Sequence, residues 1–174
     1  MLETKDLILK KAEESDWPHI YHNLWKHEES ARHMLWNVSR TEEQAQIRIQ
    51  KTMTYQKEAP FSYFVYEKKS GQAIGFAGME EIAPGVYEDT GIAIGPAFVR
   101  KGYGRQILMA LVGQAFDQLN ATKFVASCRS QNDASRQLQL ACGFVYSHSE
   151  DRTDPRNGTP YVLEFYELEN RKIA

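Results

Sequence analysis

An amphipathic segment that directly follows two closely spaced glycines limits the fold of this 174-residue chain more than any other feature. Seven apolar residues recur there at helical spacing: Ile107, Leu108, Leu111, Val112, Ala115, Phe116 and Leu119. This stripe predicts a helix with one buried face. A candidate strand, Val86–Ile94, precedes it between Pro84-Gly85 and Gly95-Pro96. We therefore expect a strand, a glycine-containing loop and a helix in succession.

The remaining elements alternate between strand-like and helix-like segments. Apolar, aromatic and β-branched runs predict strands at residues 7–9, 61–66, 73–79, 124–127, 144–147 and 160–168. A helix is expected to start near Ser15-Asp16-Trp17-Pro18. Thr41, with Gln44 three residues later, fits a capping box that opens a helix to about Gln56. Residues 134–141 predict a helix that Gly143 ends. This order predicts a mixed α/β (α+β) fold in which residues 1–174 form one domain.

Composition and charge exclude several classes of protein. The 21 Lys and Arg residues against 23 Asp and Glu give a net charge of -2, so the chain lacks the basic excess of a dedicated nucleic-acid-binding protein. Two cysteines without a C-x-x-C pair exclude a four-cysteine zinc site, and we expect no metal. Because no long apolar run or signal peptide is evident, we expect a cytoplasmic protein without a membrane partner.

The loop before the amphipathic helix has the chemistry of an anion site. Its sequence is Val99-Arg100-Lys101-Gly102-Tyr103-Gly104-Arg105. Glycines let the backbone approach a ligand closely, and the first N–H groups of a helix are unpaired and carry positive potential. A phosphate or diphosphate fits such a site, whereas the alternative is a solvated basic loop. Neither the Walker nor the Rossmann glycine pattern is present, so the expected ligand belongs to another class of phosphate compound.

Both glycines of the loop match the pattern [Q/R]-x-x-G-x-[G/A] of a known enzyme family, although Val99 stands where Gln or Arg is usual. Three further segments agree in order: residues 2–9, residues 27–36, and Asn132-Asp133-Ala134-Ser135 followed by Leu138 and Gly143-Phe144. The chain thus resembles the GCN5-related N-acetyltransferase (GNAT) family. Within that family it is similar to the RimJ/RimL-like branch of ribosomal-protein N-terminal acetyltransferases.

The resemblance implies a GNAT-like acyl-CoA N-acyltransferase fold and acetyl-CoA as the donor. Its central twisted, mostly antiparallel sheet would splay between the fourth and fifth strands, with helices on its flanks. The coenzyme would enter the opening, with its pantetheine arm along the fourth strand and its diphosphate on the glycine loop. The implied coenzyme-binding residues are Ile92, Ile94, Val99, Arg100, Lys101, Gly102, Tyr103, Gly104, Arg105 and Asn132.

The implied reaction is direct attack of a primary amine on the thioester in a ternary complex. The amine belongs to a protein N-terminus or to a small molecule, and it must lose a proton before attack. Glu80, Glu81, Glu88 and Asp89 lie near the ends of two central strands. Asp89 and Glu80 are our candidates for the general base, against the alternative that they are solvated strand-end carboxylates.

The proton donor to the departing thiolate is less obvious. Many family members carry Tyr seven residues after the motif Asn, where this chain has Gln139. Ser135 is our candidate catalytic hydrogen-bond donor, and its alternative role is to cap a helix. The absent tyrosine motivates an alternative function, a non-catalytic acyl-CoA-binding sensor module.

Histidine and tryptophan residues cluster in the segment that forms the acceptor-side wall of the family. We expect His22, Trp25, His33 and Trp36 to shape the acceptor pocket, with ordinary helix packing as the alternative. The expected partner is therefore an amine acceptor rather than a nucleic acid. The resemblance is also compatible with a homodimer.

Overall fold

The computed structural model describes residues 1–171 of the chain. Its strands are β1 (Leu2–Glu3), β2 (Leu7–Lys10), β3 (Ser62–Glu67), β4 (Ala73–Ala83), β5 (Val86–Ile94), β6 (Lys123–Arg129), β7 (Val145–Thr153) and β8 (Pro160–Glu169). Its α-helices are α1 (Trp17–Ile20), α2 (Glu28–Ala31), α3 (Glu42–Glu58), α4 (Tyr103–Gly113) and α5 (Asp133–Ala141). Tighter or wider helical turns are η1 (Glu14–Asp16), η2 (Tyr21–Trp25), η3 (Pro96–Phe98) and η4 (Gln114–Gln118).

The strands form one sheet in the order β1-β2-β3-β4-β5-β6-β8-β7. Neighbouring strands pair antiparallel, except that β5 and β6 are parallel and are connected through α4. A parallel pair requires such a crossover connection, which the predicted strand–loop–helix unit supplies. The expected mixed α/β fold with a mostly antiparallel sheet is confirmed.

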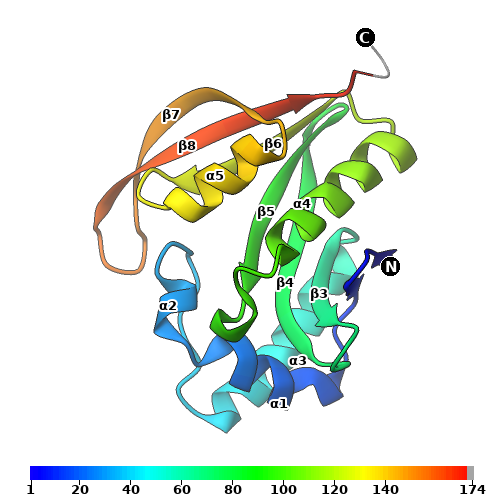
Figure 1. The fold of residues 1–174 in the computed structure, drawn as a ribbon. Coiled ribbons are helices and arrows are strands. Elements are labelled where there is room, and N and C mark those ends of the chain that lie inside the picture. Colours follow the sequence, from blue (N-terminus) through cyan, green and yellow to red (C-terminus); the bar gives the residue numbers. More distant parts are fainter. Residues whose placement is uncertain (172–174) are drawn as a thin grey trace.

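The parallel pair is short, and its two strands separate along the chain. Their register runs only from Val86 opposite Lys123 to Glu88 opposite Val125. Beyond this point β6 continues to pair with β8 as far as Arg129. Because β5 no longer pairs with β6 there, the sheet opens between the fourth and fifth of the strands predicted from the sequence. Figure 1 shows the two halves of the sheet diverging, with α4 beside β5 and α5 beside β6.

Two hydrophobic clusters lie on opposite faces of the sheet and fix its layers. On one face, α4 buries Ile107, Leu108 and Leu111 at 1% exposure or less. On the other face, Trp25 and Ile49 pack with strand residues such as Phe64. Burying a side chain of this size contributes about 1.5–3 kcal/mol. The apolar stripe predicted from the sequence therefore anchors the helix whose first turn faces the opening.

Local signals set the helix ends, with one difference from expectation. The Thr41 hydroxyl accepts the N–H of Gln44 at 3.3 Å, and α3 begins after it as predicted. The Gln44 side chain, however, accepts the N–H of Arg40 at 2.7 Å instead of that of Thr41. The second hydrogen bond of the capping box is thus made to Arg40, the residue before the N-cap, and not to Thr41 itself. Gly143 follows α5 at φ 89°, the left-handed conformation that makes glycine suitable there.

Candidate active site

A cavity of about 560 Å³ lies where β5 and β6 separate. Its lining comes from β5, the loop before α4, β6, the start of α5 and the segment after α2. The cavity contains most of the coenzyme-binding residues expected from the sequence: Ile92, Ile94, Val99, Arg100, Gly102, Tyr103, Gly104, Arg105 and Asn132. A volume of this size can accommodate a cofactor-sized molecule.

The glycine loop presents its main chain to the cavity. Gly102 has φ 78° and precedes α4, and Arg100 is also left-handed at φ 61°. The first intrahelical bond runs from the N–H of Gln106 to the carbonyl of Gly102 at 3.3 Å. The N–H groups of residues 103–105 consequently have no acceptor within the helix. These donors lie at the positive end of the helix dipole, which suits a diphosphate.

Two side chains of the loop turn toward the body of the protein. Tyr103 donates its hydroxyl to Glu67 Oε1 at 2.7 Å, and Lys101 Nζ lies 3.5 Å from the same oxygen. The hydrogen bond from Tyr103 lowers the pKa of Glu67, and Glu67 in turn helps raise the pKa of Tyr103 to about 12. These contacts tie the loop to β3. The cavity lining includes Arg100 and Arg105 and does not include Lys101.

A bulge in β5 brings its residues onto one wall of the cavity. Ala77 pairs with Ile92 and Met79 pairs with Asp89, so β5 contains one extra residue opposite Gly78. Strict alternation would place Asp89 and Ile92 on opposite faces of the sheet. The extra residue, with Gly91 at φ 110°, reverses the alternation, and Asp89, Ile92 and Ile94 all line the cavity.

Asp89 bridges the point at which the two strands part. Its Oδ2 accepts the N–H of Ser127 on β6, and its Oδ1 accepts the N–H of Gly91, each at 3.0 Å. Burial raises the pKa of Asp89 to about 7, while these two N–H groups lower it and Glu88 raises it. A carboxyl group with such a pKa can take up a proton near neutral pH.

The other carboxylates considered from the sequence do not line the cavity. Glu80 is exposed on β4 and lies opposite Glu88 on β5. Burial raises the pKa of Glu88, and the charge of Glu80 adds to this. The structure therefore brings Asp89, and not Glu80, to the opening between the strands.

The first turn of α5 supplies polar side chains to the opposite wall. Asn132 precedes the helix, and its Oδ1 accepts the N–H of Ser135 at 3.2 Å. Both residues line the cavity, as expected from the motif. The capping role of this motif thus belongs to Asn132, which leaves the Ser135 hydroxyl beside the cavity.

The four predicted acceptor residues separate in space. His33 lines the cavity, and burial, with Arg129 and Arg32, lowers its pKa and favours the neutral ring. His22 is exposed. Trp25 is 1% exposed in the core, and Trp36 packs against Phe76 outside the cavity lining. The contacts of Trp25 and Trp36 are those of helix packing, including the Arg48 guanidinium 4.6 Å and 4.7 Å from their ring centres.

A buried ion-pair cluster beside the cavity was not evident from the sequence. Asp154, in the turn between β7 and β8, contacts Arg129 and Arg156 at 2.7 Å each. Arg156 also donates to the carbonyl of Trp36 at 2.8 Å. Hydrogen bonds from Arg156 and Arg129 hold the pKa of Asp154 well below its usual range. The cluster joins the end of β6 to the segment after α2.

Several further cavity residues were not predicted as site residues, among them Ser127, Cys128 and Gln139. Ser127 and Cys128 lie on β6, which faces β5 across the opening. Gln139 lies one helical turn after Ser135, a spacing that indicates a shared face. Among residues 1–171, no group of three or more His, Cys, Asp or Glu side chains is arranged to hold a metal ion. No helix in the same range is both long and apolar enough to cross a bilayer.

Comparison with known proteins gives a consistent result for most of the chain. A family model described as an acetyltransferase (GNAT) domain matches residues 6–145. An uncharacterized N-acetyltransferase of Bacillus subtilis (strain 168), YoaA, is 24% identical over 169 residues, which cover 97% of this chain and 96% of that protein.

Two solved structures share the fold. A proposed ribosomal-protein-serine acetyltransferase from Vibrio cholerae superimposes with a TM-score of 0.81 at 20% identity, covering 97% of both chains. RimL, a ribosomal L7/L12 alpha-N-protein acetyltransferase in complex with coenzyme A, gives a TM-score of 0.77 at 19% identity, covering 95% of both chains.

Proposed function

The chain belongs to the GNAT family of acetyltransferases, and from this premise we propose that it transfers the acetyl group of acetyl-CoA to a primary amine by direct attack within a ternary complex. The nitrogen–carbon bond forms as the carbon–sulfur bond breaks. The nitrogen loses a proton, and the departing thiolate gains one. No covalent intermediate on the enzyme is required.

The residues that line the cavity fit the coenzyme. The N–H groups of residues 103–105, with Arg100 and Arg105 nearby, would bind its diphosphate. A Cβ added at Gly104 would approach Leu138 Cδ2 to 3.1 Å, closer than an ordinary van der Waals contact, so glycine keeps this part of the cavity open without displacing Leu138. Ile92 and Ile94 would lie along the pantetheine arm, and Asn132 would contact it.

Asp89 is the general base in this proposal. Its pKa of about 7 lets it accept a proton from the amine near neutral pH. Each oxygen already accepts one N–H group, and a carboxylate oxygen can accept a second hydrogen bond. Ser135 donates a hydrogen bond to the departing sulfur, a role that its position on the cavity wall supports.

A protein acceptor is favoured by the names of the two solved neighbours, and its N-terminus by the name of RimL, whereas a small amine is the alternative. His33 lines the cavity and would meet the acceptor. Because its lowered pKa favours the uncharged ring, His33 does not repel an ammonium group that enters the site.

One observation carries the proposal: unpaired first-turn amides and a carboxyl with a pKa near neutrality line the same cavity. The test is release of free thiol from acetyl-CoA with a panel of peptides and small amines, with product masses as a second readout. We expect acetylated product with at least one acceptor class. Tight coenzyme binding without turnover on any amine would instead favour the sensor function.

A further inference from the structure

Gln139 is a buried amide at the position where many GNAT members carry a tyrosine. It lines the cavity from α5 and is 3% exposed. A primary amide has two N–H donors and an oxygen acceptor, and burying them is unfavourable unless each finds a partner. The partners of Gln139 therefore reveal its role.

Within residues 1–171, the hydrogen-bond partners of the Gln139 side-chain amide lie on the β6–α5 side of the cavity. Its Nε2 donates to the carbonyl of Ser127 at 3.2 Å and to Ser135 Oγ at 3.4 Å. Its Oε1 accepts from Cys128 Sγ at 3.8 Å. Because a carbonyl can only accept, Ser127 fixes which end of the amide is the nitrogen. Burial raises the pKa of Cys128 to about 11, which keeps the thiol protonated and able to donate.

This orientation determines the direction of the Ser135 hydroxyl hydrogen. Since Gln139 donates to Ser135 Oγ, the hydrogen of Ser135 cannot point at Gln139. The hydroxyl instead hydrogen-bonds Cys128 Sγ, which lowers the pKa of that thiol. Because Ser135 also lines the cavity, a sulfur that enters the cavity can replace Cys128 as the acceptor of this hydrogen. We propose that Gln139 is a positioning residue that turns the Ser135 hydroxyl hydrogen toward the departing sulfur. The inference rests on the proposed function, because it assumes that Ser135 is the donor to that sulfur.

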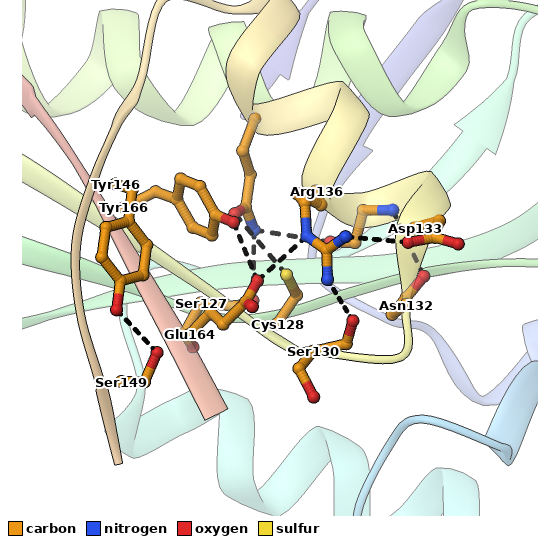
Figure 2. A network of polar contacts seen from close by, with 12 residues as sticks. Ser127, Cys128, Ser130, Asn132, Asp133, Arg136, Tyr146, Ser149, Glu164 and Tyr166 are labelled. Atoms are coloured by element: carbon orange, nitrogen blue, oxygen red, sulfur yellow. Dashed lines mark hydrogen bonds and ion pairs between the residues drawn. The ribbon is translucent and has the colours of Figure 1, made fainter. Parts of the chain in front are cut away.

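The helix that carries both residues is held firmly against the sheet. Arg136 contacts Glu164 on β8 at 3.0 Å and Asp133 at 2.9 Å, and it also donates to the carbonyl of Ser130. Tyr166 donates to Glu164 at 2.8 Å. Figure 2 shows Arg136 between Glu164 and Asp133, with Ser127 and Cys128 close by. Ser135 and Gln139 therefore have a rigid support, as precise hydrogen bonding requires.

Two substitutions distinguish the effect of the hydrogen bonds that Gln139 donates from the effect of the space that its side chain fills. Gln139→Glu keeps the shape, but an ionised carboxylate only accepts and draws the Ser135 hydrogen toward itself. Gln139→Met keeps the volume and removes both functions. We expect kcat to fall about tenfold or more in Gln139→Glu and less in Gln139→Met, with the KM for acetyl-CoA within about twofold of wild type. Melting temperatures and coenzyme titration report whether each variant is folded and binds.

The pH profile of Gln139→Glu gives a readout that a structural role would not move. Protonating the new carboxyl restores a donor to Ser135, and burial raises the pKa of such a group. Its neighbour is the Cys128 thiol on β6, and the charged or titratable groups that act on that thiol are Glu164 on β8, Arg136 on α5 and Asp89 on β5. Tyr166 on β8 is coupled to the same thiol. We expect the ratio of its kcat to that of wild type to rise as the pH falls from about 8 to about 6. The ratio for Gln139→Met should stay flat.

A double-mutant cycle with Ser135→Ala completes the test. If Gln139 acts through Ser135, then Ser135→Ala combined with Gln139→Glu is no slower than Ser135→Ala alone. Suppose that Ser135→Ala lowers kcat as expected. The inference would then be overturned if the losses of kcat in the two single variants add up in the double variant, or if the kcat ratio of Gln139→Glu to wild type does not change with pH. An unchanged kcat in Ser135→Ala would also overturn the inference, because Ser135 would then not be the donor to the departing sulfur. Absence of turnover in the wild-type protein with every amine would instead contradict the proposed function.

Discussion

The two walls of the cavity present different kinds of chemistry. The first, which we call the main-chain wall, consists of residues 92–105 and offers helix N–H groups, while the side chains of Lys101 and Tyr103 turn away to Glu67. The second, the side-chain wall, consists of residues 126–139. It offers hydroxyl, thiol and amide groups bonded to one another.

This difference separates binding from chemistry. Backbone N–H groups recognise a diphosphate without depending on side-chain identity, so the first wall is sensitive mainly to added bulk. Hydrogen-bonded side chains have defined orientations, so the second wall is sensitive to isosteric exchange. Substitutions on the first wall should therefore change KM for acetyl-CoA, and those on the second should change kcat.

The largest effect is expected at Asp89, which joins the two walls through Ser127. Asp89→Asn should lower kcat by about 10²–10⁴-fold, because the amide cannot accept the proton of the amine. The wild-type rate should rise with pH through about 7 as Asp89 loses its proton, and the variant should lose this dependence. Rate profiles against pH at saturating substrates measure both.

The matched control for Asp89→Asn is Glu80→Gln on the neighbouring strand. Glu80 is exposed and outside the cavity lining, so the variant should keep the wild-type pH dependence. If Glu80→Gln altered the pH profile and Asp89→Asn did not, Glu80 and not Asp89 would be the general base.

A smaller effect is expected at Gly104 on the main-chain wall. Its added side chain would crowd Leu138 and cover the N–H groups of the first turn. Loss of one hydrogen bond to a charged group, about 1.5–3 kcal/mol, raises the KM for acetyl-CoA about tenfold or more in Gly104→Val. Gly113→Val, at the other end of the same helix, has no atom within 4 Å of the new Cβ and should leave that KM unchanged. Equal KM values for acetyl-CoA in the two variants would contradict the proposal that the diphosphate binds to this loop.

The cations of the main-chain wall should contribute less than its amides. Arg105→Gln should raise the KM for acetyl-CoA about two- to fivefold, because exposed charges are screened by solvent and salt. The increase should shrink when the KM is measured at high salt. Lys101→Gln should leave KM close to wild type, since Lys101 faces Glu67 and not the cavity. A larger rise in the KM for acetyl-CoA in Lys101→Gln than in Arg105→Gln would contradict the orientation of the loop, in which Arg105 lines the cavity and Lys101 faces Glu67.

The smallest kinetic effect is expected at Asp154, which supports the cavity from outside. Asp154→Asn removes the contacts to Arg129 and Arg156 and should lower the melting temperature without changing the KM for acetyl-CoA. The pKa of Asp154 is lowered in the fold, so its stabilisation is present above the unfolded value of about 4 and is lost as the pH falls below it. The melting temperatures of wild type and Asp154→Asn should therefore differ at neutral pH and approach each other as the pH falls below about 4. Asp151→Asn, on exposed β7, is the control.

The sequence allowed the glycine loop, α4 and the end of α5 to be predicted, because each depends on neighbouring residues. The stripe from Ile107 to Leu111 and the glycine Gly143 are local signals, and both lie as expected. The cap at the start of α5 is Asn132, whereas the sequence offered Ser135 for that role. The acceptor residues were harder, because His22 and His33 share no pattern that tells an exposed ring from one at the cavity. Trp25 resembles a pocket residue in sequence but lies in the core.

The rest depended on contacts between distant residues. The bulge that aligns Asp89 with Ile92 arises from the pairing of β4 with β5, and Asp154 meets Arg129 only once the sheet has formed. Gln139 had a usable signal, its spacing of one helical turn from Ser135, but its donor role required the positions of Ser127 and Cys128. Side-chain orientation in the second wall is thus a property of the assembled fold.

A crystal structure with coenzyme A bound tests most directly whether the opening between β5 and β6 is where acetyl transfer takes place. We predict the diphosphate within hydrogen-bonding distance of the N–H groups of residues 103–105 and the thiol end between Asp89 and Ser135. A coenzyme bound elsewhere, with that helix start engaged by the protein's own side chains, would contradict it.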